Sequence, residues 1–390
     1  MLTAEALEQV VPIFYCSGRS GSVFLHSLLD NHPDVIAMPP VLAGYYEFLT
    51  ECSKIPHCDV ISLFCDYYEV LFQVDSEKLI IGSGRAPGIQ LGLDKMGEEG
   101  DQKLQVDRKV FEVALREIFE GRSEVDSRFF FQAIHLAYAR ALGRHFEDRD
   151  RAPIIVYQLH NPILQRFRRL LADFPQAQAL STIRNPIQSF GSHATAHVKQ
   201  GTTNAQTLKY LLQESFYGGE PLLEPQRKHS RAVRLEDLKL KTRPTLQALC
   251  DWLQIPWDDA LLDSTISGLT WWNVKDSSRI RGFDTTPLKR KHENLFNTFD
   301  RFRLEVILGD KYAQWGYEPL AEWSDYSLMR QLLELPFKFE RFYAADEGMF
   351  QQNRPIVRRF MQTYWDYVHL SEEPRRLLEV LEPADASVGE

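Results

Sequence analysis

Short runs of apolar residues alternate along the chain with longer segments whose apolar residues recur at three- and four-residue spacing. Residues 10–16, 154–157 and 179–183 form such runs, which are bounded by turn-forming residues and are typical of buried strands. A segment with helical spacing follows each of them. Because strands that alternate with helices pair in parallel and bury both faces, the pattern predicts an α/β fold with a central parallel sheet flanked by helices.

Two regions depart from this alternation. Residues 40–150 carry aromatic clusters with helical patterning and are too long for one crossover, so we expect a mainly helical insertion over the sheet. After a last strand at residues 232–235 the pattern is helical to the end of the chain. We therefore expect a main domain over 1–320 and a helical C-terminal extension over 321–390, which packs on that domain or forms a homodimer contact.

A glycine-containing loop follows the first predicted strand. It reads Ser17-Gly18-Arg19-Ser20-Gly21-Ser22 and leads directly into a helical segment. Free N–H groups and the dipole at a helix start attract anions, and glycines let the backbone come close to them. The Lys-Ser/Thr pair of a Walker A loop is missing after Gly21, which argues against a site for ATP or GTP with Mg²⁺. The loop predicts a phosphate site, with a tight turn that binds nothing as the alternative.

A second basic motif follows the strand at residues 179–183. Arg184 lies at the strand end, and Asn185-Pro186 is typical of a helix N-cap with proline in the first turn. Ser192 lies two turns into that helix, where it shares a face with the helix start, and an arginine can bind phosphate through two hydrogen bonds. A surface ion pair of Arg184 beside a helix cap is the alternative.

Composition and charge limit the remaining classes of function. A net charge of −9 argues against a nucleic-acid partner, which needs a clustered positive surface. The five cysteines lack disulfide or zinc spacing, and His193 and His197 lack a third ligand nearby, so we expect no metal. The sequence shows neither a long apolar run nor a signal peptide, from which we expect a cytoplasmic protein without a transmembrane segment.

The two motifs together resemble those of the sulfotransferase superfamily that uses 3′-phosphoadenosine 5′-phosphosulfate (PAPS). Residues 14–34 are similar to its 5′-phosphosulfate loop, and residues 184–192 to its RNPxxxxxS motif for the 3′-phosphate. The segments RLEDL at 234–238 and WGYEP at 315–319 are also similar to segments of that family and stand in the same order. The resemblance implies its P-loop-like α/β fold over about 10–320, with residues 40–150 as a substrate cap.

The resemblance also assigns roles to residues of both motifs. It implies that Arg19 binds the bridging oxygen and acts in catalysis, and that Phe24 stacks on the adenine. Val23 departs from the family's second hydroxyl residue, so that only its backbone N–H can serve. The predicted cofactor-binding residues are Arg19, Ser20, Gly21, Ser22, Val23, Phe24, Arg184 and Ser192, together with Arg281 and Lys289 from a late basic loop that also offers Arg279 and Lys291.

The general base and the acceptor are less defined. The resemblance of residues 158–162 to a T-H-x-P segment implies that His160 is the base, and Glu47 is the alternative. Sulfuryl transfer would proceed by in-line attack of a hydroxyl or amine, without a metal, on a small-molecule, glycan or peptide acceptor that the sequence does not identify. The alternatives are a P-loop kinase-like nucleotide phosphotransferase and a non-catalytic nucleotide-binding or scaffold protein.

Overall fold

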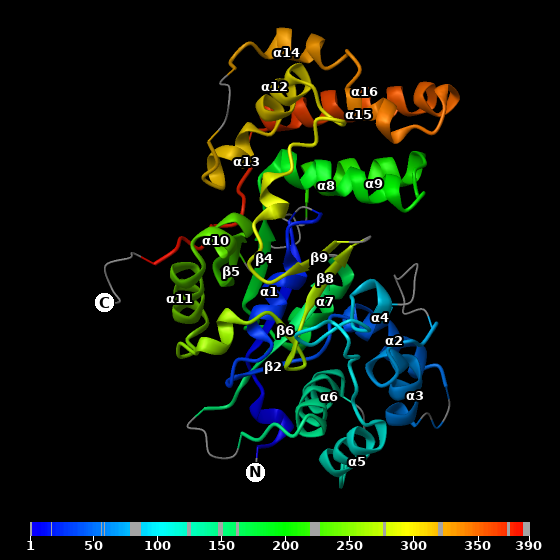
Figure 1. Cartoon of the computed structure of the whole chain (residues 1–390), viewed down its shortest axis with the longest axis vertical. Helices are drawn as coiled ribbons and strands as arrows, with labels where there is room; N and C mark the ends of the chain where they lie inside the picture. Colours follow the sequence, from blue (N-terminus) through cyan, green and yellow to red (C-terminus); the bar gives the residue numbers. More distant parts are fainter. Residues whose placement is uncertain are drawn as a thin grey trace.

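Five parallel strands form the central sheet in the order β2-β3-β1-β4-β5 (Figure 1). They are β1 (Val10–Tyr15), β2 (Val35–Ala37), β3 (Ile154–His160), β4 (Ala179–Ile183) and β5 (Ser230–Arg234). β1 and β4 are buried along their whole length, as their uninterrupted apolar runs require. The predicted parallel α/β sheet is confirmed. β2 was not predicted, since three residues are too few to show a periodic pattern.

The computed structural model describes residues 2–16, 18–55, 57, 59–78, 87–122, 126–146, 151–160, 164–218, 227–275, 278–318, 323–372 and 375–384. Within these ranges the side chains of residues 87, 160, 164, 274, 275 and 278–280 are not described. In the described part of the chain no helix is long and apolar enough to cross a membrane. Four of the described cysteines are buried, namely Cys16, Cys52, Cys65 and Cys250.

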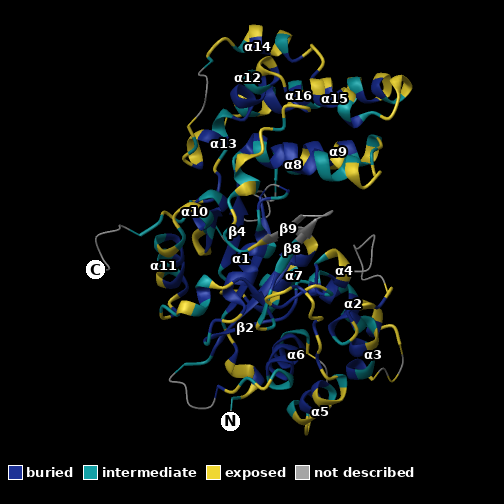
Figure 2. Cartoon of the chain, in the orientation of Figure 1, coloured by how far each residue is buried: buried dark blue, intermediate teal, exposed yellow. Residues whose placement is uncertain are grey.

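Helices cover the sheet and close its core. α6 and α7 cover the face that carries Phe14 and Tyr157, because Phe131 lies with its ring 5.1 Å from Tyr157 and Phe167 with its ring 6.3 Å from Phe14. Figure 2 shows the sheet as the most deeply buried part of the molecule. The flanking helices are α1 (Ser22–Leu29), α6 (Ser127–Ala141), α7 (Leu164–Asp173), α8 (Pro186–Lys199), α10 (Leu235–Leu240) and α11 (Thr242–Leu253).

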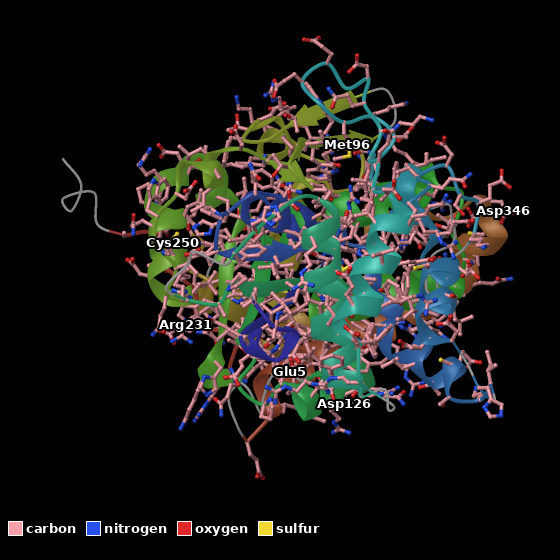
Figure 3. The ribbon with its side chains drawn as sticks, turned by 90° about the horizontal axis from the view of Figure 1, so that it is seen from below. Glu5, Met96, Asp126, Arg231, Cys250 and Asp346 are labelled. Carbon is pink, nitrogen blue, oxygen red and sulfur yellow. The ribbon has the colours of Figure 1, made fainter. Side chains whose placement is uncertain are left out.

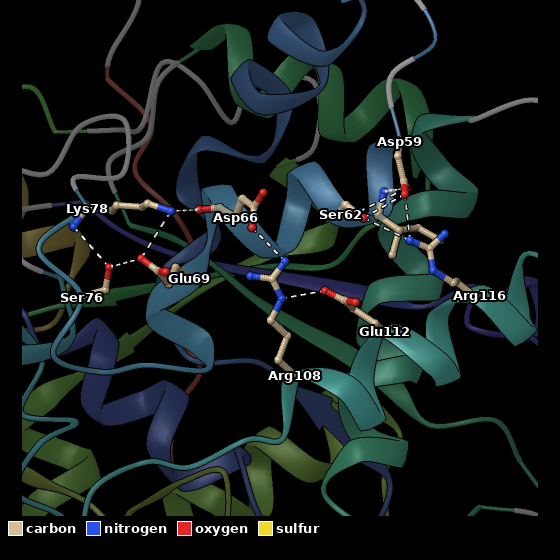
Figure 4. Close-up of polar contacts among 10 residues, drawn as sticks. Asp59, Ser62, Asp66, Glu69, Ser76, Lys78, Arg108, Glu112 and Arg116 are labelled. Atoms are coloured by element: carbon tan, nitrogen blue, oxygen red, sulfur yellow. Dashed lines mark hydrogen bonds and ion pairs between the residues drawn. The ribbon is translucent and has the colours of Figure 1, made fainter.

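The segment between β2 and β3 is the predicted helical insertion. Its aromatic residues pack against one another and belong to the same core as the sheet, and the Phe64 ring lies 5.6 Å from Phe48 and 5.7 Å from Phe130. Ion pairs between α3 and α5 tie its outer surface, including Arg116 to Asp59 at 2.8 Å (Figure 4). Seen along the long axis, these helices lie on the opposite flank from Cys250 (Figure 3). The insertion contains α2 (Tyr45–Cys52), α3 (Val60–Tyr67), α4 (Pro87–Gln90), α5 (Arg108–Ile118) and α6, with short turns η2 (Leu42–Gly44) and η3 (Glu69–Leu71).

A second apolar core lies beyond the carboxyl end of the sheet (Figure 1). It joins α8 and α9 (Ala205–Phe216) to helices from the last hundred residues, so the predicted boundary at residue 320 falls inside this core. These later helices are α12 (Thr298–Ile307), α13 (Gly309–Gln314), α14 (Tyr326–Leu332), α15 (Lys338–Tyr343) and α16 (Glu347–Leu370).

Smaller elements complete the chain. After α16 the backbone returns to the sheet edge, where the N–H of Ala232 in β5 donates to the carbonyl of Glu379 at 2.8 Å. Two hairpins lie between α11 and α12: β6 (Thr265–Ile266) with β7 (Leu269–Thr270), and β8 (Trp272–Lys275) with β9 (Ser278–Arg281). The remaining 3₁₀ turns are η1 (Ala4–Ala6), η5 (Asp259–Leu262) and η6 (Thr286–Lys289).

Candidate anion-binding site

The two predicted phosphate motifs lie side by side at the carboxyl edge of the sheet. β1 and β4 are neighbours, with Tyr15 in register with Thr182, so the loop after β1 and the residue Arg184 after β4 start from adjacent points. β1 is also where the strand order changes direction, since β3 and β2 lie on one side of it and β4 and β5 on the other. In open α/β sheets ligands bind at this kind of position.

Contacts with β4 and α8 hold the first loop in place. Ser20 Oγ lies 2.9 Å from Thr182 Oγ1, and Ser189 Oγ donates a hydrogen bond to the Gly18 carbonyl. Arg19 and Gly21 both have positive φ, 64° and 94°, which turns the chain into the first turn of α1. This conformation leaves the N–H groups at the start of α1 without a partner inside the helix.

Glycine is required at two points of this loop by close packing. A Cβ on Gly18 would lie 2.7 Å from Cε1 of His193, and one on Gly21 would lie 2.7 Å from Cδ1 of Leu235. Ser22 is the buried first residue of α1, and Val23 packs its side chain against the main core. The Val23 side chain therefore offers no hydroxyl where the predicted loop has one, and the backbone N–H is what remains.

The second motif forms the predicted helix cap and contact. Asn185 caps α8 by accepting a hydrogen bond from the N–H of Gln188 at 3.2 Å, and Pro186 is the first helical residue. Arg184 Nη1 donates to Ser192 Oγ at 3.1 Å, and its Nη2 donates to the Pro287 carbonyl at 2.5 Å. The Arg184 Nε atom is buried without a hydrogen-bond partner. Arg184 and Ser192, which were expected to bind one phosphate, thus lie in contact with each other.

The guanidinium groups of the two motifs are close enough to affect each other. Burial, followed by the charges of Arg184 and Arg290, lowers the pKa of Arg19 to about 10. Burial also lowers the pKa of Arg184, against the opposing effect of Glu236. Among the described residues, neither Arg19 nor Arg184 forms an ion pair with a carboxylate. Buried like charges without a carboxylate partner are unfavourable alone and are stabilised by a bound anion.

The late basic loop contributes residues that differ from those predicted. Arg290 affects the pKa of both Arg19 and Arg184, and His292 Nε2 lies 3.3 Å from Ser192 Oγ. The His292 ring also packs on Gly191, where an added Cβ would lie 2.6 Å from it. Burial, followed by the charges of Arg184, Arg290 and Arg301, lowers the pKa of His292 to about 4.

The predicted residues of that loop lie elsewhere. Arg281 forms an ion pair with Glu98 at 2.6 Å, and Lys289 is exposed at the end of η6. The side chain of Arg279 is outside the described residues, and Lys291 is exposed. Five cations within thirteen residues give no pattern that could have distinguished Arg290 in the sequence.

Phe24 lies beside a small cavity at the other end of the loop. Its ring makes an edge-to-face contact with Phe283 at 5.5 Å, and Lys239 Nζ lies 4.2 Å above it. Burial lowers the pKa of Lys239 to about 8. The cavity has a volume of about 150 Å³ and is lined by Leu262, Asp263, Ser264, Thr270, Arg281, Gly282 and Phe283.

The two candidate bases, His160 and Glu47, lie in different surroundings. His160 is the last residue of β3, and its backbone lies beside Phe14, but its side chain is outside the described residues. Glu47 on α2 accepts a hydrogen bond at 2.6 Å from Nε of the buried Arg166 and so forms an ion pair within the insertion. Among the described residues no three His, Cys, Asp or Glu side chains are grouped as metal ligands.

Comparisons with known proteins give distant structural matches. No family model and no curated protein matches the chain. Three solved structures to which it is similar are sulfotransferases. The sulfotransferase domain of the Synechococcus PCC 7002 olefin synthase is 15% identical, with a TM-score of 0.39 over 66% of this chain and 76% of that one. The sulfotransferase domain from the curacin biosynthetic pathway is 17% identical, with a TM-score of 0.39 over 66% and 78%. Sulfotransferase STF9 from Mycobacterium avium is 12% identical, with a TM-score of 0.34 over 65% and 66%.

Proposed function

We propose that the protein is a PAPS-dependent sulfotransferase, which transfers the sulfuryl group of that donor to a hydroxyl or amine by in-line attack. The observation that carries the proposal is the meeting of two basic sites at neighbouring strand ends. One is the loop with Arg19, and the other is the Arg184–Ser192 pair. PAPS carries anionic groups at both ends of its ribose, whereas ATP has a single polyphosphate chain.

The charges of the site match a donor with two anionic groups. Arg19 and Arg184 are like charges that burial makes costly, and Arg290 adds a third. A hydrogen bond to a charged partner contributes about 1.5–3 kcal/mol, so two phosphate groups can offset that cost. In this proposal the Arg19 loop binds the 5′-phosphosulfate, and Arg184, Ser192 and Arg290 bind the 3′-phosphate.

Sulfuryl transfer requires mainly that the acceptor and the donor are held in position and that the charge on the leaving group is stabilised. As the acceptor atom bonds to sulfur, the bridging S–O bond breaks and negative charge collects on the departing 5′-phosphate. Arg19 and the N–H groups at the start of α1 lie on the side where that charge develops. Phe24, next to the cavity at Phe283, is the proposed contact for the adenine. The sequence resemblance implies His160, at the end of β3, as the base.

Ligand-dependent thermal stability tests this function directly. We expect adenosine 3′,5′-bisphosphate to raise the melting temperature in the presence of EDTA, and to do so more than adenosine 5′-phosphate, which lacks the 3′-phosphate. The variant R184A should remove the difference between these two ligands. Stabilisation by ATP with Mg²⁺ but not by the bisphosphate would refute the proposal in favour of a phosphotransferase. Bisphosphate binding without release of sulfate from PAPS would identify a non-catalytic nucleotide-binding protein.

A further inference from the structure

A buried carboxyl lies directly behind the Arg19 loop. Glu214, on the last turn of α9, accepts a hydrogen bond from the hydroxyl of Tyr15 at 3.0 Å, and Tyr210 on the same helix also hydrogen-bonds its carboxyl group. Tyr15 is the last residue of β1, so this contact joins the strand that ends in the loop to a helix 199 residues later. Gly218 packs against the Cys16 carbonyl and holds this end of α9 against the loop.

The second carboxyl oxygen faces the loop through a histidine. Glu214 Oε2 is buried without a hydrogen-bond partner, and it lies 3.7 Å from Nδ1 of His193, which is also without one. His193 is the residue whose ring packs on Gly18, so the carboxyl and the loop backbone are separated by one imidazole ring. The cluster formed by Tyr15, His193, Tyr210 and Glu214 is therefore in contact with the proposed donor site, although only Tyr15 belongs to a sequence motif.

The protonation states of this cluster differ from those of exposed groups. Burial raises the pKa of Glu214 to about 7, against the hydrogen bonds from both tyrosines, which lower it. Burial, then the neighbouring His197, then the charge of Arg19, lower the pKa of His193 to about 3, so this imidazole is neutral and a poor base. The groups that face Glu214 are Tyr15 from β1, Tyr210 from α9 and His193 from α8, with His197 one turn farther.

We propose that Tyr15 and Glu214, in place of His160, form the proton-accepting pair for the transfer reaction, in which Tyr15 contacts the attacking hydroxyl and Glu214 acts through it. The step rests on the proposed sulfotransferase function. As the acceptor oxygen bonds to sulfur, its proton passes to the Tyr15 oxygen while the Tyr15 proton passes to Glu214 Oε1. The bridging S–O bond breaks, and its electron pair leaves with the 5′-phosphate. Glu214 ends protonated and Tyr15 ends neutral, as it began.

The same cluster provides a way for that proton to leave. Tyr210 hydrogen-bonds Glu214 and Tyr15 and is 38% exposed, so the cluster extends from the buried carboxyl to a side chain at the surface. A purely structural carboxyl would need no such connection. The other carboxyl whose pKa burial raises to about 7, Glu340, serves as a comparison: it accepts a hydrogen bond from the N–H of Phe337 at 2.6 Å and caps α15.

The test uses water as the acceptor hydroxyl, so that no acceptor has to be identified. Release of labelled sulfate from PAPS is measured from pH 5 to pH 9 for the wild type and for E214Q, Y15F and E340Q. We expect the wild-type rate to rise with pH through a midpoint near 7, where Glu214 ionises. E214Q and Y15F should each lose about 10²–10⁴-fold in rate, the usual contribution of a general base. E214Q should also lose the rise with pH, and E340Q should keep it.

Binding of adenosine 3′,5′-bisphosphate, measured by calorimetry, separates this inference from the proposed function. E214Q and Y15F should bind it within about threefold of the wild type, which also shows that they fold. A wild type that does not bind the bisphosphate overturns both the function and the inference. A wild type that binds it but releases no sulfate likewise overturns both. A wild type that binds it and releases sulfate, but with the same pH profile in E214Q, overturns the inference alone.

Discussion

Replacing Gly18 by alanine tests whether the loop's position depends on its contact with His193. The new Cβ would lie 2.7 Å from Cε1 of the His193 ring and closer still to Nδ1, whereas ordinary contacts start at 3.4 Å, so the atoms must separate by at least 0.7 Å. His193 is buried against α9 and has no free space to move into, because Glu214 lies 3.7 Å beyond it. We therefore expect the loop to take up most of this shift.

The size of the effect follows from the geometry of hydrogen bonds to phosphate. A bond of about 2.9 Å that lengthens by the same amount leaves the normal range. Each lost bond to a charged group costs about 1.5–3 kcal/mol, which is roughly a 10- to 100-fold loss of affinity. G18A should thus bind adenosine 3′,5′-bisphosphate at least about tenfold more weakly in calorimetry, and overpacking should lower its stability by about 1–3 kcal/mol.

Two further variants control this experiment. Gly309 at the start of α13 has no atom near an added Cβ, so G309A should bind the bisphosphate like the wild type and be equally or more stable. H193A removes the ring that an added Cβ on Gly18 would meet. Adding G18A to H193A should therefore lower the affinity for the bisphosphate by less than adding G18A to the wild type does. Wild-type affinity in G18A, or equal losses with and without His193, would refute the steric account.

Three other predictions concern charges. R290A should weaken bisphosphate binding about tenfold or more in calorimetry, because the charge of Arg290 acts on both Arg19 and Arg184, while K289A, one residue earlier, should leave it unchanged. Equal effects of the two variants would refute this role of Arg290. His135 is fully buried, and burial lowers its pKa to about 4, below the value of about 6.5 in an unfolded chain; its stabilising contribution is therefore complete above pH 6.5 and is lost as the pH falls toward 4, by roughly 3 kcal/mol. H135Q should flatten the melting temperature across this range, and an unchanged slope would contradict it. D300A should cost about 3–5 kcal/mol in urea denaturation, because it leaves the fully buried Arg303 without its carboxylate at 2.6 Å; a loss below about 1 kcal/mol would show that the carbonyl contacts suffice.

The fold was predictable where each element carries its own signal. The strand at Ala179–Ile183 was predicted with its exact bounds, because five apolar or small residues stand between a turn and Arg184. The cap at Asn185 was predicted because the Asn-Pro pair has one favoured conformation at a helix start. The small hairpins after α11 were not predicted, since strands of two to four residues show no period and their pairing depends on the fold around them.

In the candidate site, too, the residues with a local sequence signal were predictable and the residues placed by tertiary packing were not. Arg184 and Ser192 stand eight residues apart on one strand end and one helix, so their contact follows from local geometry alone. Arg290 and His292 reach the same place only because a later segment folds back over α8, where Gly191 leaves room for the His292 ring. The sequence of the late basic segment does not show which of its cations lies near Arg184, because that depends on tertiary packing.

The Tyr15–Glu214 contact is another that depends on tertiary packing and not on local sequence. Tyr15 stands in the first motif, but Glu214 stands in none, and in sequence it looks like one more charge on an amphipathic helix. Its burial follows from α9 packing across the carboxyl end of β1, where Gly218 permits an approach to Cys16 that any side chain would block. A group that binds the donor can be read from contiguous residues because phosphate recognition uses backbone N–H groups and nearby side chains. A group that accepts the proton has to face the donor from another element, and so it depends on the whole fold.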